Sequence, residues 1–314
     1  MRLKLRLSLK NLIILIGLIV LGCFLILLTG CSGEAQSEEE NKSEQRVELV
    51  SSHPSFVTKE EWNSILAEQA ASRAENVALP EGRIVSAVLP HHLVAGRLIV
   101  NAIETLARQN PNLIILVGPN HFNKGAKVIT GFSGWQTPEG VVAVEDRVVS
   151  VLLDKGLALR DEEVLSQEHS VGALVPFLKY FLPEAKIVPL ILHHDVSLHE
   201  VDALLNALEP FLNGRAVLIS SVDFSHYLPR SEAQAKDRET IRYMRNFNYA
   251  TLFSLGNDYL DSPASLAAAL RLAEKRGFKE FSVLDNTNSG IILQNDFIET
   301  TSYFTLVFSE RGSA

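Results

Sequence analysis

Histidines beside short apolar runs are the residues of this sequence best suited to chemistry. Four of them, His91, His121, His169 and His226, lie far apart along the chain. Imidazole is a ligand that suits iron, copper and zinc. Because the carboxyl ends of parallel strands meet in one crevice of an open α/β sheet, residues that follow different strands can share a site. The four histidines therefore predict a metal-centred pocket.

His91 and His121 are the candidate metal ligands. His91 follows Pro90 at the end of an apolar run, where proline ends strand pairing. His121 follows the next apolar run through Gly118-Pro119-Asn120. A single histidine in such a position is more often a hydrogen-bonded structural residue. Two of them after adjacent strands form half of a metal site.

Asp223 and His226 are candidates for proton transfer. They follow another apolar run in the stretch Ser220-Ser221-Val222-Asp223-Phe224-Ser225-His226. At this spacing the carboxylate can orient a nearby imidazole, whose pKa lies near neutrality, as a general acid or base or as support for a metal ligand. The alternative is an aspartate that caps a helix beside an incidental histidine.

His169 opens a predicted helix in Glu168-His169-Ser170. At a helix amino terminus the dipole lowers a histidine's pKa and favours the neutral form, so His169 is a third candidate catalytic residue. Alternatively, Glu168 and Ser170 only cap the helix. The remaining histidines are assigned to structural or surface roles: His53, His92, His193, His194 and His199. The doublet ends a predicted strand and is the weakest of these five assignments.

The amino terminus has the pattern of a lipoprotein signal peptide over residues 1–30. Basic residues precede an uncharged apolar run from Leu12 to Leu28, which leads into Leu28-Thr29-Gly30-Cys31. A transmembrane anchor is the alternative, since the run is nearly long enough to cross a bilayer. Small residues before Cys31 and the lack of a following basic cluster favour cleavage after Gly30. We therefore expect an extracytoplasmic protein that is anchored to the membrane by lipid chains on Cys31.

Residues 31–46 comprise this cysteine and a predicted disordered tether, which is polar and acidic and contains no aromatic residue. Cleavage of the signal removes four basic residues and lowers the number of Lys and Arg from 29 to 25. The 37 Asp and Glu remain, so the net charge becomes −12. Such a charge argues against nucleic acid as a partner. The two cysteines, Cys23 and Cys31, belong to the signal and the lipid anchor, so no disulfide and no thiolate metal ligand remain.

Residues 47–314 are expected to form one α/β domain with a largely parallel, mixed central sheet flanked by helices. Short apolar runs, most of them rich in β-branched residues, predict strands at 84–89, 113–117, 187–192, 216–220, 281–284 and 303–308. Helical periodicity predicts helices near 95–109, 171–181, 198–212, 233–246 and 265–275. Thr58-Lys59-Glu60-Glu61 has the spacing of a capping box and predicts a further helix that opens the domain.

The segment Val128–Val144 is interpreted as a β-hairpin or flap inserted after His121. Its position in the sequence makes it a candidate lid over the site. An edge hairpin without a gating role is the alternative.

The histidine stretches resemble those of the Memo-like family, also called AmmeMemoRadiSam system protein B, in order and spacing. The resemblance rests on Pro90-His91, Gly118-Pro119-Asn120-His121, Glu168-His169-Ser170 and Ser220 to His226, and it covers Ile84 to Phe308. That family is similar to the LigB-type class III extradiol dioxygenases, in which two histidines and a carboxylate hold non-heme Fe(II). The resemblance implies a LigB/Memo-like fold, His91 and His121 as ligands, and His226 as the catalytic histidine.

The third ligand position of the family, commonly a cysteine before a helix, falls on Asp261. Exchange of a thiolate for a carboxylate moves the site away from Cu(I) and toward Fe(II), Mn(II) or Zn(II). The resemblance thus implies a divalent metal, with Fe(II) favoured and Cu, Zn or Mn as alternatives. Asp261 is also a candidate for an ordinary helix N-cap, with Ser262 and Pro263 at the first helical positions.

Two functions of different classes fit these residues. The first is a metal-dependent oxidoreductase that binds a small chelating substrate such as a catecholate, activates O₂ and moves protons through His226. The second is a non-catalytic module that binds metal, a small ligand or a peptide in the same pocket. Hydrolysis by a zinc-bound water is less favoured, for want of a second carboxylate base. The family name implies an association with AMMECR-type and radical-SAM proteins, from which export would separate this chain.

Overall fold

The computed structural model describes residues 52–71 and 82–310. The chain divides into two units, Met1–Glu48 and Leu49–Ala314, and the described residues belong to the second unit. The predicted signal peptide, Cys31 and the acidic tether lie outside the described residues. Among the helices of the described part, none combines the length and the apolar character needed to cross a bilayer.

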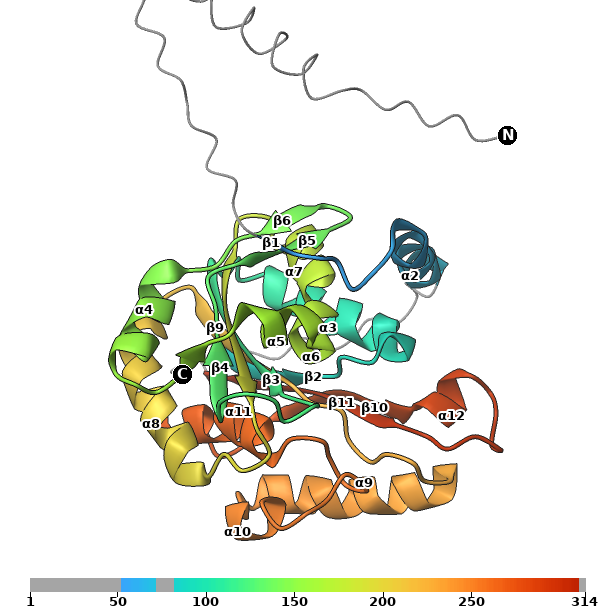
Figure 1. Ribbon diagram of the computed structural model, residues 1–314. Coiled ribbons are helices and arrows are strands. Elements are labelled where there is room, and N and C mark those ends of the chain that lie inside the picture. Colours follow the sequence, from blue (N-terminus) through green and yellow to red (C-terminus); the bar gives the residue numbers. More distant parts are fainter. Residues whose placement is uncertain (1–51, 72–81, 311–314) are drawn as a thin grey trace, which may run out of the picture. The chain divides into compact units, whose positions relative to one another are not determined.

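An eight-stranded mixed sheet forms the centre of the second unit (Figure 1). In sheet order its strands are β10 (Ser282–Asn288), β11 (Ser302–Ser309), β2 (Ile84–Leu89), β9 (Ala216–Ser221), β3 (Leu113–Pro119), β8 (Lys186–Leu192), β4 (Val128–Thr130) and β7 (Leu159–Arg160). The central strands β2, β9, β3 and β8 run parallel, and β11 and β10 extend the sheet antiparallel at one side. The predicted fold class and all six predicted strands are confirmed, although β10 runs four residues further than expected.

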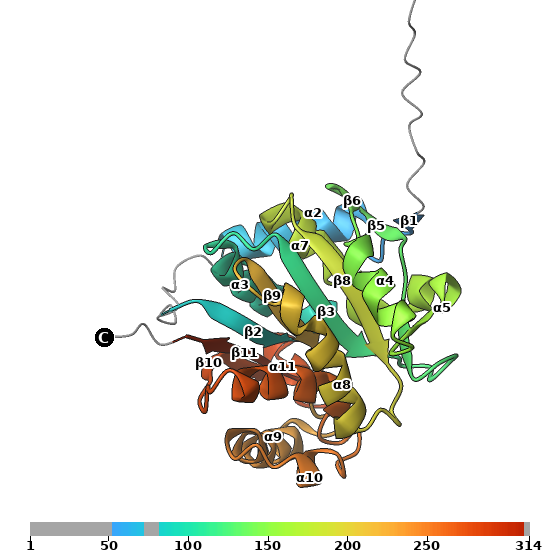
Figure 2. The same cartoon turned by 90° about the vertical axis from the view of Figure 1, so that its left-hand side faces the viewer.

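The central strands are buried on both faces, which explains why their residues are largely apolar rather than alternately apolar and polar. On one face lie α3 (Gly96–Ala107), α6 (His169–Gly172) and α7 (Val175–Phe181). On the other face lie α11 (Pro263–Lys275), α8 (Leu198–Leu208) and α4 (Asp146–Asp154), as Figure 2 shows. Alanine fills much of the buried side of α11, and these small side chains let the helix approach β2, β9 and β3.

The remaining helices cover the periphery. They are α2 (Lys59–Ala71), α5 (Glu162–Gln167), α9 (Arg230–Arg245), α10 (Tyr249–Leu252), α12 (Ser289–Ile292) and the short turns η1 (Leu93–Ala95) and η2 (Glu209–Phe211). The predicted capping box of α2 is confirmed: Thr58 N donates to Glu61 Oε2 at 2.9 Å and Glu61 N donates to Thr58 Oγ1 at 3.2 Å. Trp62 of α2 is fully buried.

The segment predicted as one hairpin is divided between two sheets. Its first strand, β4, belongs to the large sheet. Its other strands, β5 (Gly134–Thr137) and β6 (Gly140–Val142), form a hairpin that pairs with β1 (Ser52–His53) and packs on α7. Glu139 at the tip of this hairpin accepts hydrogen bonds from Trp62 Nε1 and Lys59 Nζ of α2. These anchors support the edge-hairpin interpretation over the lid.

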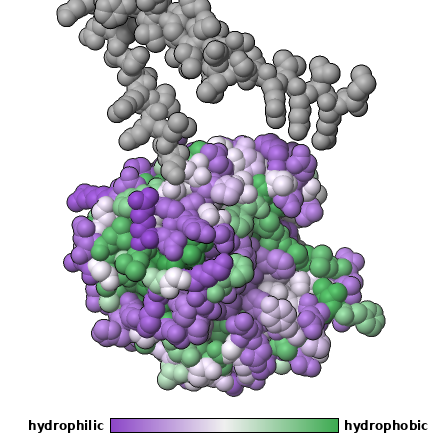
Figure 3. Space-filling view, in the orientation of Figure 1, coloured by the Kyte–Doolittle hydropathy of each residue, from purple (hydrophilic) through white to green (hydrophobic). Residues whose placement is uncertain are grey.

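Exposed apolar side chains gather after strand β10. Ile291, Leu293 and Phe297 are 37%, 55% and 101% exposed, and they lie in α12 and the residues that follow it. Figure 3 shows hydrophobic surface on the side where α12 lies, within a face that is otherwise largely hydrophilic.

Candidate metal centre

The ends of three neighbouring strands and the starts of two helices position the site residues. His91 follows β2, His121 follows β3, and Asp223 follows β9. Because β9 lies between β2 and β3 and all three are parallel, their loops leave the same edge of the sheet side by side. His169 opens α6, and Asp261 lies two residues before α11.

His91 is buried and neutral, with one ring nitrogen directed into the site. Ser221 Oγ donates its proton to the carbonyl of Ser170 at 2.6 Å, so it accepts from His91 Nδ1 at 2.9 Å. Nδ1 therefore carries the ring proton, and the lone pair is on Nε2. Burial lowers the pKa of His91 well below its usual value, and the imidazoles of His121 and His169 lower it further.

Glu168 fixes His121 in the same tautomer. Glu168 Oε1 lies 2.8 Å from His121 Nδ1, and Oε2 accepts from the His121 backbone N–H at 2.9 Å. Burial opposes ionisation of Glu168, but hydrogen bonds from His121 and Ser170 outweigh it and lower its pKa. An ionised carboxylate only accepts, so His121 Nδ1 donates, and in the neutral ring this leaves the lone pair on Nε2. Glu168 also caps α6, so the interpretation of this residue as a cap alone is incomplete.

Asp261 lies where the two histidine lone pairs converge. Its Oδ2 is 3.4 Å from His91 Nε2 and 3.8 Å from His121 Nε2. Its other oxygen, Oδ1, is buried without a hydrogen-bond partner among the described residues. Burial raises the pKa of Asp261 well above its usual value, and the nearby Asp223 raises it further. The imidazoles of His91 and His121 and the carboxylate of Asp261 thus face one another in a buried site. This is the donor set expected for a metal ion, so the three residues fit a metal site.

The alternative interpretation of Asp261 as a helix N-cap is wrong. The cap of α11 is Ser262, whose Oγ accepts from Ser265 N at 3.1 Å, and Pro263 is the first helical residue. Asp261 is instead tied to Asp223: its N–H donates to the Asp223 carbonyl, and its Oδ2 accepts from Asp223 N, both at 3.1 Å. The carboxylate is therefore placed by the loop after β9 rather than used by the helix.

His169 stands beside buried His91 and half-buried His121. Its ring stacks on His121 with 4.1 Å between centroids and lies 5.2 Å from the His91 ring. Each of the three offers a nitrogen within 4.8 Å of the others, so His91, His121 and His169 form a group that could hold a metal ion. The His169 side chain is 44% exposed, which places it at the solvent side of the group. Burial of the rest of the ring lowers its pKa, as does His121.

Asp223 lies at this centre, but it does not form with His226 the simple pair that their spacing suggested. Asp223 Oδ1 accepts from the backbone N–H of His91 at 3.1 Å, and Oδ2 lies 3.7 Å from His91 Nε2. Asp223 influences His226 through its charge, which raises the pKa of that imidazole against the larger lowering effect of burial. His226 Nδ1 lies 3.3 Å from the carbonyl of Asn257.

Two partners of the site were not identified from the sequence. Ser221 orients His91, but nothing in its local pattern distinguishes it from Ser220. His92 was assigned to a structural or surface role, yet its Nδ1 lies 2.6 Å from the hydroxyl of buried Tyr303. Burial raises the pKa of Tyr303, and the charge of Asp223 raises it further, which places this pair near the centre.

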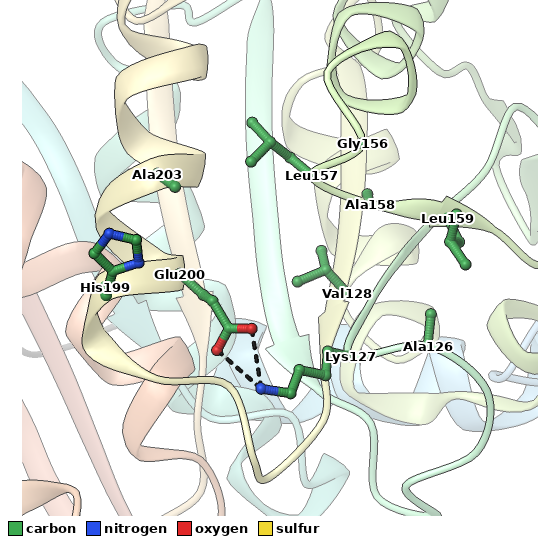
Figure 4. Close-up of a pocket in the computed structure, with 10 residues that line it drawn as sticks. All are labelled: Ala126, Lys127, Val128, Gly156, Leu157, Ala158, Leu159, His199, Glu200 and Ala203. Atoms are coloured by element: carbon green, nitrogen blue, oxygen red, sulfur yellow. Dashed lines mark hydrogen bonds and ion pairs between the residues drawn. The ribbon is translucent and has the colours of Figure 1, made fainter.

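The other histidines lie elsewhere. His53 packs on Trp135 with 4.4 Å between ring centroids, a structural role as predicted. His199 lines a pocket of about 320 Å³ between α8 and the strands β4 and β7, where Lys127 and Glu200 form an ion pair (Figure 4). None of the predicted site residues lines this pocket. His193 and His194 follow β8 and form a separate group with Asp195.

These features define an α/β protein with a histidine-rich centre that could hold a metal at the carboxyl ends of its parallel strands. The family model described as Memo-like protein matches residues 59–307. The chain belongs to this family, which confirms the resemblance inferred from its histidine stretches.

Curated relatives and a solved structure are also similar to this chain. A MEMO1 family protein of Caldivirga maquilingensis is 26% identical over 256 residues, which cover 78% of this chain and 90% of the relative. A MEMO1 family protein of Methanopyrus kandleri is 29% identical over 236 residues, which cover 72% and 83%. The crystal structure of an uncharacterized protein from Escherichia coli K12 matches with a TM-score of 0.48 and 14% identity over 71% of this chain and 99% of its own.

Proposed function

We propose that this protein is a non-heme metal-dependent oxidoreductase that binds Fe(II) through His91, His121 and Asp261. The observation that carries the proposal is the convergence of His91 Nε2 and His121 Nε2 on one oxygen of Asp261, at 3.4 Å and 3.8 Å. Hydrogen bonds on the far nitrogens hold both rings in the tautomer that a metal ligand needs.

The donor types favour iron among the divalent metals. Two imidazoles and one carboxylate with open positions are the ligand set of non-heme Fe(II) oxygenases. No cysteine stands at the site to favour Cu(I). When bound, such a metal would supply coordination sites for a small chelating substrate and for O₂.

The remaining residues have roles that follow from their positions. Burial lowers the pKa of His226, so its ring is neutral near pH 7 and able to accept a proton from a substrate hydroxyl. Asp223 supports this role because its charge favours the protonated ring after transfer. His169, exposed on the solvent side, is the second candidate for proton transfer or a further ligand.

We also propose that the protein works outside the cytoplasm, attached to the membrane through a lipidated Cys31. The apolar run before Leu28-Thr29-Gly30-Cys31 supports this proposal. The substrate would then be an extracytoplasmic small chelating molecule, and cytosolic AMMECR-type or radical-SAM proteins would not be physical partners.

Metal analysis tests the centre. The full chain is purified anaerobically in detergent with a tag that lacks histidine, together with His91→Ala, His121→Ala and Asp261→Asn. His199→Ala, an exposed histidine outside the centre, is the control. We expect near-stoichiometric iron in the wild type and the control, and loss of iron in the other three. Absence of uptake of iron, copper, zinc or manganese would overturn the metal centre.

Oxygen consumption tests the activity of the iron-loaded protein. With catechols as probe substrates, the wild type should consume O₂. His226→Ala should keep its iron but lose about 100-fold or more in rate, the usual contribution of a general acid or base. Full iron content without O₂ consumption would overturn the enzyme and favour the binding module instead.

A further inference from the structure

A second group of candidate metal ligands lies at the end of β8, apart from the centre around His91. It consists of His193, His194 and Asp195, which directly follow the last strand residue, Leu192. One ligand atom from each of the three lies within 4.8 Å of the others. From the sequence, this doublet was assigned to a structural or surface role, and only the folded chain shows the aspartate in contact with both rings.

The carboxylate of Asp195 contacts both imidazoles. Oδ1 lies 3.0 Å from His194 Nε2, and Oδ2 lies 3.6 Å from His193 Nδ1. The two rings are 4.3 Å apart between centroids and tilted by 32°. Each ring therefore presents a nitrogen to a different oxygen of one carboxylate, which gathers two nitrogen donors and one oxygen donor in a small volume.

Backbone hydrogen bonds fix this turn to its neighbours. His193 N donates to the Lys127 carbonyl at 2.8 Å, and His194 N donates to Asn123 Oδ1 at 2.9 Å. Asn123 lies two residues after His121, so the turn after β8 is tied to the loop that begins at the buried centre. The donor group is thus attached to a rigid strand end rather than carried on a free loop.

The group is open to ions from solvent. The side chains of His194 and Asp195 are 64% and 60% exposed, and that of His193 is 17% exposed. Asp195 N donates to His193 Nδ1 at 3.1 Å, and a metal ion at that nitrogen would replace this hydrogen bond. Water would complete the coordination on the exposed side.

We propose that His193, His194 and Asp195 form a second, surface site for a divalent transition metal ion, Zn(II) or Cu(II). Imidazole nitrogen with one carboxylate suits these ions, whereas Mg(II) and Ca(II) prefer sites made of oxygen alone. This site does not depend on the proposed function of the buried centre, since the two share no ligand.

Equilibrium metal binding tests the proposal. The full chain, with a tag that lacks histidine, is titrated with Zn(II) and with Cu(II) in competition with a chelator of known affinity. The double variant His193→Ala/His194→Ala is compared with His199→Ala, which removes an exposed imidazole on α8 outside the group. We expect one bound ion fewer in the double variant and no change in the control. Asp195→Asn should bind at least tenfold more weakly than the wild type.

A second measurement separates the two sites. His91→Ala/His121→Ala should retain the surface ion, and that ion should protect His193 and His194 from modification by diethylpyrocarbonate. If the buried centre binds nothing, the wild type should still hold one ion that the His193→Ala/His194→Ala variant lacks. Equal metal content and affinity in the wild type and that variant would overturn the surface site, as would an equal loss in His199→Ala.

Discussion

At the scale of single residues, the chemistry of the centre depends on groups that touch the far side of each imidazole. Glu168 accepts from both Nδ1 and the backbone N–H of His121, while Ser221 accepts from His91 Nδ1. These partners fix which nitrogen is free and keep the rings from rotating away from Asp261. A carboxylate behind a ligand histidine also increases the basicity of the ligating nitrogen.

Removal of the charge on Glu168 should therefore weaken metal binding, although Glu168 is not itself a proposed ligand. We expect Glu168→Gln to lower metal affinity by about 10- to 100-fold, the usual effect of losing such an orienting partner. The dissociation constant is measured by competition with a chelator. Glu163→Gln, an exposed neighbour on α5, is the control and should bind as the wild type does. Equal affinity in both variants would contradict this role for Glu168.

At the scale of elements, the site depends on how loops after different strands are tied together. The loop after β9 and the residues before α11 exchange hydrogen bonds between Asp223 and Asp261, and Phe224 pairs with Leu260 in an isolated bridge. The position of Asp261 thus follows from the pairing of two segments that are 38 residues apart. A shift of α11 along the sheet would move the carboxylate away from the histidines.

Helix α9 is attached to β11 through a buried acid. Asp237 is 4% exposed and accepts hydrogen bonds from Ser225, Ser302 and Asn286. Burial raises the pKa of Asp237 to about 6, although these hydrogen bonds act in the opposite direction. In the unfolded chain the pKa of an aspartate is about 3.9. Between these values the folded protein binds the proton and the unfolded chain does not.

Asp237 should therefore make the protein less stable as pH rises. Its contribution is fully present below about pH 4 and is lost as pH rises through about 6. Asp237→Asn mimics the protonated acid and does not titrate. The free energy of unfolding of this variant minus that of the wild type should therefore increase by about 2 to 3 kcal/mol between pH 4 and pH 7. Urea unfolding at several pH values measures the difference. Glu232→Gln, exposed on the same helix, is the control. A difference that stays constant with pH would contradict the burial effect.

At the scale of the whole molecule, an acidic domain without disulfides is expected to be attached to a membrane surface. The two cysteines lie at positions 23 and 31, so the fold from residue 52 onward is stabilised without cross-links. A domain of this size buries enough surface to allow that. In that case, both the surface metal site and the buried centre would be exposed to the metal ions present outside the cytoplasm.

Replacement of Cys31 tests the anchor directly. The full chain expressed in cells fed radioactive palmitate should carry label, and Cys31→Ser should lose it, because the thiol is the predicted attachment point. Cys23→Ser is the matched control and should keep the label, since that residue leaves with the signal. A wild-type protein that carries no label yet stays in the membrane fraction after alkaline extraction would indicate a transmembrane anchor instead. Label retained in Cys31→Ser would contradict lipidation there.

Much of the fold was predictable because its signals are local. The runs that became β2, β3, β8 and β9 are largely apolar, as is usual for strands buried on both faces, and the capping box of α2 lies within four residues. The hairpin after His121 was not predictable in the same way. Its strands joined two different sheets because pairing with β8 and with β1 depends on distant segments.

The sequence by itself was enough to predict the fold class and the family and to single out His91, His121 and Asp261 as candidate ligands. Periodicity and short motifs involve residues that are close together in the chain, so they can be recognised without the structure. Tertiary structure alone decided what these residues do to one another. It excluded Asp261 as a cap, paired Glu168 with His121, and brought Asp195 into contact with both His193 and His194. Tautomer, burial and distance between donors depend on contacts across the sheet, and such contacts exist only when distant segments of the chain pack together.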